Sequence, residues 1–179
     1  MNIFYLDEDP VKCAEYYNDA HVRKMIIELS QMLSTAHRVL DGEFYYRHGK
    51  NNRRIRAYQI NDYRNNILYL ATHENHPSCI WTRLSRSNYN YVYKLFCALC
   101  DEYSFRYGKI HATDTKLRKI LNKLPDNIED KGLTEVPLAM ENEYKLDSPI
   151  EAYRNYYRKG KAHLAEWTKR EIPCWFNKR

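Results

Sequence analysis

Helix-breaking residues are scarce in this chain of 179 residues, which has five glycines and six prolines. It has no run of about 20 apolar residues, the length that a membrane-spanning helix needs, so we expect no membrane partner. The first ten residues, MNIFYLDEDP, are acidic and lack the basic-then-apolar order of a signal peptide. No internal repeat, low-complexity tract or domain linker is present. We therefore expect one helical domain, residues 1–179, located in the cytoplasm.

Cysteines are few and odd in number: Cys13, Cys79, Cys97, Cys100 and Cys174. In a chain without a secretory signal, reduced thiols are the expected state. Cys97 and Cys100 form a C-x-x-C, but no second pair follows and both lie in an apolar helical row. Core packing is favoured over metal binding there, and we expect no metal and no cofactor.

What the chain has in excess is positive charge and tyrosine. Its net charge is +6, its isoelectric point is about 9.0, and 17 residues are tyrosines. Tyrosine stacks on bases and still forms hydrogen bonds, so basic and aromatic side chains together favour DNA or a small nucleotide as partner. The alternative is that many of these rings are core side chains with a hydroxyl at the surface. The oligomeric state is left open.

The predicted fold class is all-α, a compact single-domain bundle with two long amphipathic helices and a basic inserted loop. Residues 1–6 are expected to be extended. Caps and breakers predict helices from Asp9 and Pro10, from Asp19 to Gly42, from Ser85 or Ser87 to Gly108, from Thr113 to Pro125, and from Ser148 to Gly160. A short helix and an aromatic tail should follow. We interpret the first half of residues 43–66 as an irregular basic loop or a small inserted helix.

Residues 18–40 carry two rows at helical spacing. The core row consists of apolar residues: Val22, Met25, Ile26, Leu29, Met32, Leu33, Ala36 and Leu40. Along its edge runs a second row: His21, Lys24, Glu28 and Thr35. Lys24 and Glu28 are four residues apart and suit a surface ion pair. The alternative is that Glu28 is a general acid/base or stabilises a cationic intermediate, while Lys24 holds a phosphate.

This row resembles a motif of the pyrimidine-dimer DNA glycosylase family (the phage UV endonuclease, endonuclease V type). In that family an Asp-x-His is followed, seven residues after the histidine, by Glu-Leu, as in DAHVRKMIIEL at residues 19–29. A second block, His-Pro-x-x-x-Trp, corresponds to residues 76–81. It leads into a helix with the sequence LCDEY at residues 99–103, then RYG at 106–108. The two blocks span about a third of the chain.

The resemblance implies a specific chemistry. In the family the N-terminal α-amine attacks C1′ of the damaged nucleotide and forms a Schiff base, and β-elimination then nicks the strand. By position, Met1 supplies the amine, Glu28 is the catalytic carboxylate, and His21 and Lys24 line the sugar or phosphate pocket. Since α-amines have pKa values near 8, part of such a group is an unprotonated nucleophile at neutral pH.

The chain departs from the family at several positions. Asn2 is large enough to keep the initiator methionine in place, so the amine belongs to Met1. The family's basic residues beside the glutamate are Ile27 and Gln31 here.

Further binding residues are expected outside the helix. His76 and Trp81 belong to the second block; His76 either contacts a ligand or caps the turn. Arg83 and Arg86 are expected at the start of a helix, where backbone N–H groups favour a phosphate. Arg53 and Arg54 belong to a basic segment that either grips a nucleic-acid backbone or is simply solvated: Arg47, His48, Lys50, Arg53, Arg54 and Arg56.

The first interpretation is a DNA-repair-like N-glycosylase with Schiff-base lyase activity. The second is a binding protein, a phage-type sponge that captures a cyclic-nucleotide immune signal in the same basic, tyrosine-rich pocket; a signal-cleaving enzyme would be intermediate. Either would work in the host cell's cytoplasm if the protein is phage-encoded. The third is a structural or interaction module in which Glu28 forms only an ion pair.

Overall fold

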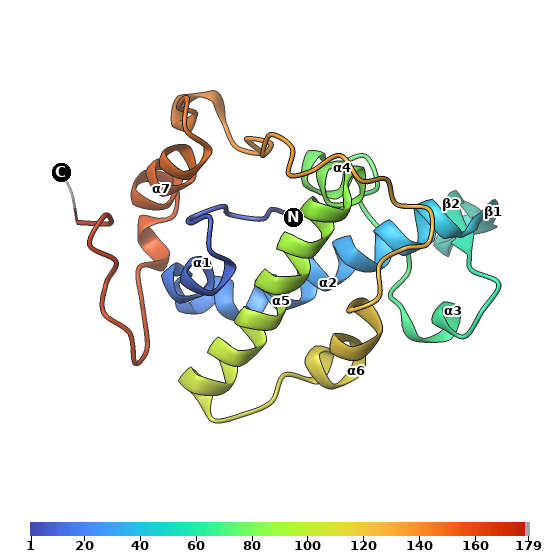
Figure 1. Ribbon diagram of the computed structural model, residues 1–179, viewed down its shortest axis with the longest axis horizontal. Coiled ribbons are helices and arrows are strands. Elements are labelled where there is room, and N and C mark those ends of the chain that lie inside the picture. Colours follow the sequence, from blue (N-terminus) through green and yellow to red (C-terminus); the bar gives the residue numbers. More distant parts are fainter. Residues whose placement is uncertain (178–179) are drawn as a thin grey trace.

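The computed structural model describes residues 1–177, which are mostly helical (Figure 1). Its α-helices are α1 (Pro10–Tyr16), α2 (Asp19–Asp41), α3 (Arg64–Ile67), α4 (Pro77–Leu84), α5 (Arg86–Tyr107), α6 (Ala112–Leu121) and α7 (Pro149–Gly160). Its strands are β1 (Glu43–His48) and β2 (Arg54–Gln59), and its 3-10 turns are η1 (Lys50–Asn52), η2 (Asn142–Tyr144) and η3 (Ala162–Leu164). Within residues 1–177, every helix is too short or too polar to cross a bilayer.

The core forms where α2 crosses α5, near the middle of the molecule (Figure 1). The predicted apolar row on α2 is confirmed, since all of its members except the half-buried Leu40 are buried. From α5, Val92, Leu95, Phe96 and Leu99 have no exposed surface and pack in the same cluster. At roughly 1.5–3 kcal/mol for each fully buried side chain, this contact is the main source of stability.

Most predicted helix ends are confirmed, and two N-caps differ. Asp9 caps α1, with Pro10 in its first turn, and Gly42 ends α2. Ser85 caps α5, Gly108 ends it with a left-handed φ of 65°, and Ser148 caps α7. α2, however, is capped by Asn18, whose side chain accepts a hydrogen bond from the His21 N–H at 2.9 Å. α6 is likewise capped by the residue before it, His111, rather than beginning at Thr113.

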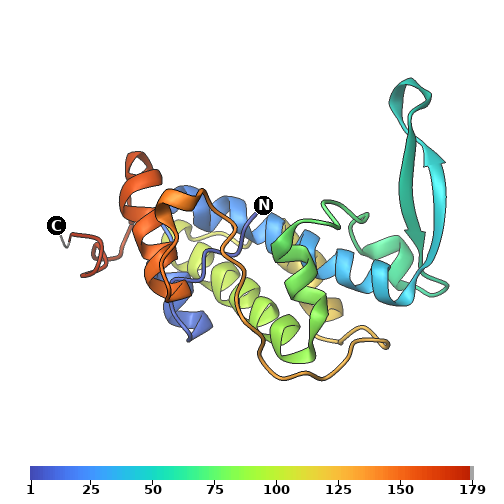
Figure 2. The same ribbon diagram turned by 90° about the horizontal axis from the view of Figure 1, so that it is seen from above.

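The segment predicted as a loop or small helix is a β-hairpin, which corrects the all-α class. β1 and β2 pair antiparallel, with Tyr46 opposite Arg56 and His48 opposite Arg54. Figure 2 shows this hairpin standing away from the helical body. Every residue of β1 is exposed, so the strand has no buried side. The apolar/polar alternation by which strands are recognised was therefore missing.

The two ends of the chain pack beside α7. Residues 1–6 have no regular secondary structure, and Phe4 packs against Tyr153, Tyr156 and Tyr157 of α7. The predicted short helix after Gly160 is only the 3-10 turn η3. The aromatic tail does pack down, with Trp167 and Trp175 buried.

Candidate functional site

The α-amino group of Met1 lies beside the carboxylate of Glu28. Its nitrogen is 3.6 Å from Glu28 Oε2, and the backbone N–H of Asn2 donates to the same oxygen at 3.2 Å. The other oxygen, Oε1, is 3.0 Å from Nζ of Lys24, one turn earlier on α2. The Glu28 side chain is 13% exposed and that of Lys24 is 63% exposed. Two positively charged nitrogens therefore face one carboxylate at the edge of the core.

Met1 turns its side chain inward. The side chain is 2% exposed, and its sulfur lies 3.1 Å from Sγ of Cys79 on α4. Met1 as a whole is half-buried, so its exposed surface belongs to the backbone, which carries the amine. The bulk of the methionine side chain therefore lies on the core side of the amine.

Asn2 holds the amine in this position. Its side-chain Nδ2 donates to the carbonyl of Ala139 at 2.8 Å, and its Oδ1 accepts from the N–H of Ile3 at 2.8 Å. Asn2 is 7% exposed. Its side chain therefore fixes the backbone that ends in the amine, a role that the sequence alone did not indicate.

His76 connects this amine to a neighbouring hollow. The residue caps α4, and its Nδ1 accepts a hydrogen bond from the Ser78 N–H at 3.2 Å. Partial burial, with the positive charge of the Met1 amine as a smaller cause, lowers the pKa of His76 below its usual 6.5. The ring is then neutral at pH 7, its proton lies on Nε2, and it offers one hydrogen-bond donor.

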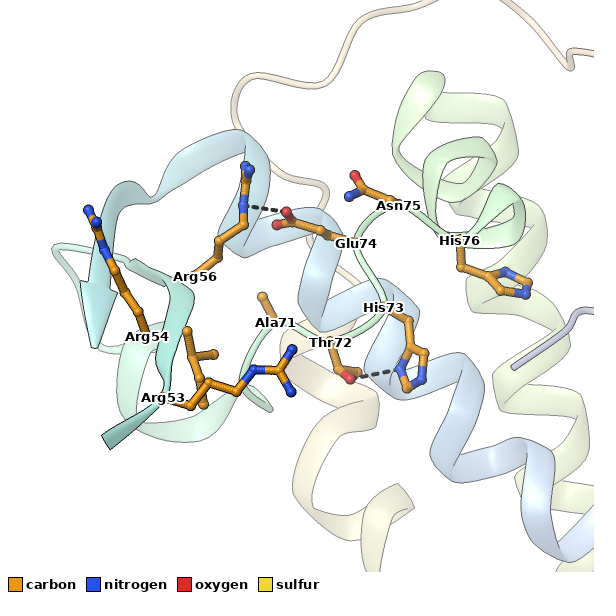
Figure 3. Close-up of a pocket in the computed structure, with 10 residues that line it drawn as sticks. Arg53, Arg54, Arg56, Ala71, Thr72, His73, Glu74, Asn75 and His76 are labelled. Atoms are coloured by element: carbon orange, nitrogen blue, oxygen red, sulfur yellow. Dashed lines mark hydrogen bonds and ion pairs between the residues drawn. The ribbon is translucent and has the colours of Figure 1, made fainter. Parts of the chain in front are cut away.

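The hollow beside His76 has a volume of about 670 Å³ and lies between β2 and residues 71–76 (Figure 3). Arg53, Arg54 and Arg56 line its β2 side. Arg56 pairs with Glu74 at 2.6 Å, whereas Arg53 and Arg54 have no ion pair among residues 1–177. The hairpin arginines and the loop before α4 thus come together in one open, basic depression. Both Arg53 and Arg54, predicted to bind a ligand, belong to it.

His21 lies in the core instead of lining a pocket, which corrects its predicted role. Its ring is 4% exposed, stacks on Phe4 with centroids 4.3 Å apart, and its Nδ1 lies 2.6 Å from the Tyr157 hydroxyl. Burial lowers the pKa of His21 to about 3, with the charge of Lys24 as a smaller cause. The N-terminal segment and α7 cover this end of the row, and those contacts come from residues distant in sequence.

Trp81 and Arg83 also differ from prediction, whereas Arg86 begins a helix as expected. Trp81 is 3% exposed and its Nε1 donates to the Thr134 carbonyl at 3.2 Å, so it is a core side chain. Arg83 lies in the last turn of α4, and its guanidinium donates to the Glu74 carbonyl at 2.7 Å. Arg86 does begin α5, but its Nε donates to the Ile128 carbonyl at 3.2 Å. These three side chains stabilise loops.

Cys79 and Glu74 are neighbours of the site that sequence reasoning missed. Cys79 borders the Met1 side chain, and burial raises the pKa of its thiol to about 11, so it is an apolar contact here. Glu74 fixes Arg56 and the Tyr58 hydroxyl, the latter at 2.7 Å. Cys79 lies within the second block that carried the resemblance, and this was the available signal. Glu74 had none.

The arrangement combines a nucleophile with a proton acceptor beside a basic depression. A deprotonated amine at 3.6 Å from a carboxylate has a partner that accepts or returns a proton. Within residues 1–177, no cluster of three or more His, Cys, Asp or Glu side chains has the geometry of a metal site. No protein-family model, curated protein or solved structure gives a significant match to this chain.

Proposed function

We propose that this chain is a DNA-repair-like N-glycosylase with Schiff-base lyase activity, acting on a nucleotide in DNA. The observation that supports it is the contact between the Met1 α-amine and Glu28. It is the arrangement that the resemblance to pyrimidine-dimer glycosylases implies, and it brings together the first residue of the chain and a residue in the middle of α2.

The steps follow from these two groups. The unprotonated Met1 nitrogen attacks C1′, the bond from C1′ to the base breaks, and the base leaves with a proton. Glu28 accepts the proton from the attacking nitrogen and returns it to O4′ as the sugar ring opens. The regenerated carboxylate then stabilises the positive charge of the iminium that forms. Loss of a C2′ proton then expels the 3′ phosphate, and water hydrolyses the imine. His76 and Lys24 are suited to bind sugar or phosphate oxygens.

Reductive trapping tests this proposal. Borohydride with abasic duplex DNA should give a covalent adduct, seen as an intact-mass increase, and peptide mapping should locate it on Met1. Glu28→Gln should abolish trapping, as should selective acylation of the α-amine. The matched control is Lys24→Gln, which removes the other nearby amine and should still be trapped. An adduct on Lys24, or no adduct at all, contradicts the proposal.

A nucleotide-binding protein is the second candidate. The observation that favours it is the depression of about 670 Å³ lined by Arg53, Arg54 and His76, since small-molecule sites have volumes of roughly 300–1,000 Å³. Calorimetry with a cyclic dinucleotide should then give a defined stoichiometry. Heating should release the ligand intact, and Glu28→Gln should bind it as well as the unmodified protein does.

A further inference from the structure

The hairpin presents one face made of aromatic and basic side chains. Directly paired residues of antiparallel strands point to the same side of a sheet. The register therefore puts six residues on one face, which we name the aromatic–arginine face: Phe44, Tyr46, His48, Arg54, Arg56 and Tyr58. The opposite face carries Glu43, Tyr45, Arg47, Ile55, Ala57 and Gln59.

The rings and guanidiniums of this face are already in contact: the guanidiniums lie over ring faces, and the Phe44 and Tyr46 rings meet edge to face. Cζ of Arg54 lies 3.6 Å from the centre of the Tyr46 ring, and Cζ of Arg56 lies 5.0 Å from that of Phe44. The Phe44 and Tyr46 rings are 4.9 Å apart. Flat groups in such a series are a platform on which a base can stack, while the edges of the guanidiniums remain able to bind phosphate.

Packing within the protein does not explain this face. Phe44 is 45% exposed and Tyr46 is 46% exposed, on an arm that stands off the helical body (Figure 2). Cross-strand contacts such as Phe44 with Tyr58 help the two strands to pair, but they require no such exposure. Exposed apolar groups rimmed by charge are typical of binding surfaces.

The arm is fixed to the loop that leads to the candidate site. The Tyr58 hydroxyl and Arg56 both bind Glu74, two residues before His76, which caps α4, and Cys79 of α4 contacts the Met1 side chain. Charge selects the partner: residues 43–59 hold five Arg or Lys side chains and one acidic residue, Glu43. A polyanion with flat, unpaired bases matches both properties, whereas duplex DNA keeps its base faces stacked.

We propose that the aromatic–arginine face stacks on unpaired bases of a single-stranded DNA segment next to the nucleotide held at Met1. The choice of DNA rests on the proposed function, while the stacking argument rests on the hairpin alone. The face would hold the strand beside the target nucleotide open and would supply the grip that the missing basic residues at Ile27 and Gln31 do not.

Matched variants on the two faces test the proposal. The probe is a fluorescein-labelled 20-nucleotide single strand, titrated at several salt concentrations with the full chain. Tyr46→Thr should weaken binding roughly five- to a hundredfold, the range for losing one stacked base, with the salt slope unchanged. Arg54→Gln should reduce the slope of log affinity against log salt by about 0.7, the value for one single-strand phosphate contact.

The controls lie on the opposite face of the same strand. Tyr45→Thr, at 42% exposure, and Arg47→Gln should change affinity by less than about twofold. Tyr46→Phe keeps the ring and should bind normally. Hydrogen exchange across residues 43–59 shows whether each variant keeps its hairpin. Equal losses of affinity from variants on the two faces would overturn the proposal. So would a blunt duplex that binds as tightly as the single strand, or a change of oligomeric state in Tyr46→Thr alone.

The two proposals fail separately. If borohydride traps no adduct but variants on the two faces differ in their affinity for single-stranded DNA, the proposal for the aromatic–arginine face is retained and the glycosylase proposal is wrong. If an adduct forms and variants on the two faces bind single-stranded DNA equally well, the proposal for the aromatic–arginine face is wrong and the glycosylase proposal is retained.

Discussion

His21 and Glu28 share one row of α2, yet their surroundings differ. His21 is covered by Phe4 and bonded to Tyr157, whereas Glu28 stays at the edge of the core between Lys24 and the Met1 amine. The helical spacing predicted that both would lie where core meets surface. The spacing could not indicate that the N-terminal segment and α7 cover only the His21 end of this row.

Burial of His21 makes stability depend on pH in a defined direction. Its folded-state pKa is about 3, below the unfolded value near 6.5, so the unfolded chain binds a proton that the folded chain does not. This contribution is fully present above pH 6.5 and is lost as the pH falls toward 3. His21→Asn, which keeps a polar atom near Nδ1 but does not titrate, should flatten the fall by about 1.4 kcal/mol per pH unit.

Urea unfolding at pH 7.0, 6.0 and 5.0 measures this difference. His37 is a necessary comparison, because burial also lowers its pKa, to about 4, and it remains in the variant. The free energy of unfolding of His21→Asn should therefore still fall as the pH is lowered, but less steeply than that of the parent protein. Parallel curves for the two proteins would mean that His21 is protonated in the folded state.

Glu28 itself is predicted to act on chemistry more than on stability. The lysine end of its pair with Lys24 is largely solvated, and glutamine keeps an oxygen that can accept from the Asn2 N–H, so Glu28→Gln should cost about 1 kcal/mol or less in the free energy of unfolding. The same change should remove borohydride trapping. A melting temperature within a few degrees of the parent, measured by circular dichroism, would separate the two effects.

Helices and hairpin differ in how far the sequence specifies them. α2 and α5 were predicted because each buries an apolar row against the other, and the row is visible in the sequence. The hairpin has no such row, although its turn residues Gly49, Asn51 and Asn52 were available as a signal; both asparagines adopt left-handed backbone angles. Its two strands are paired by backbone hydrogen bonds, and Arg38 of α2 joins β2 to the helical body, since its guanidinium binds the Tyr58 carbonyl at 3.0 Å.

The hairpin should consequently open more easily than the helices. A two-stranded ribbon with little burial has few contacts to lose on opening, whereas the α2–α5 contact opens only with global unfolding. Hydrogen-exchange mass spectrometry should find peptides from residues 44–56 exchanging well before those from 89–100. Equal protection of the two segments would show that another contact covers the arm. Addition of single-stranded DNA should slow exchange in the hairpin selectively.

At the scale of the whole molecule, buried charges connect distant segments. Arg106 of α5 binds Asp19 at the start of α2 at 2.8 Å and Glu102 at 2.7 Å, and Arg170 of the tail binds Glu102 at 2.8 Å. Arg106 has no exposed side-chain surface. This network joins the two central helices to the C-terminal segment. The i,i+4 spacing of Glu102 and Arg106 is a sequence signal for one of its pairs, but the sequence gave no indication of the contacts with Asp19 and Arg170.

Arg106→Leu should therefore lower the free energy of unfolding by roughly 3–5 kcal/mol, because it leaves Asp19 buried without its partner. Arg118→Leu is the matched control, since it also removes an α-helical arginine with two carboxylate partners but at 35% side-chain exposure. Its expected cost is about 1 kcal/mol or less. Guanidinium unfolding of both variants gives the comparison, and costs of similar size would contradict the assigned role of burial.

The inward position of the Met1 side chain also bears on how the protein should be produced. Residues added ahead of Met1, such as a purification tag, would turn its amine into an amide with no basic lone pair. They would also separate the Met1 nitrogen from its contact with the Glu28 carboxylate. A preparation tagged at that end would lack the free amine on which the proposed chemistry depends, so material for any assay of this site should carry its tag at the carboxyl end.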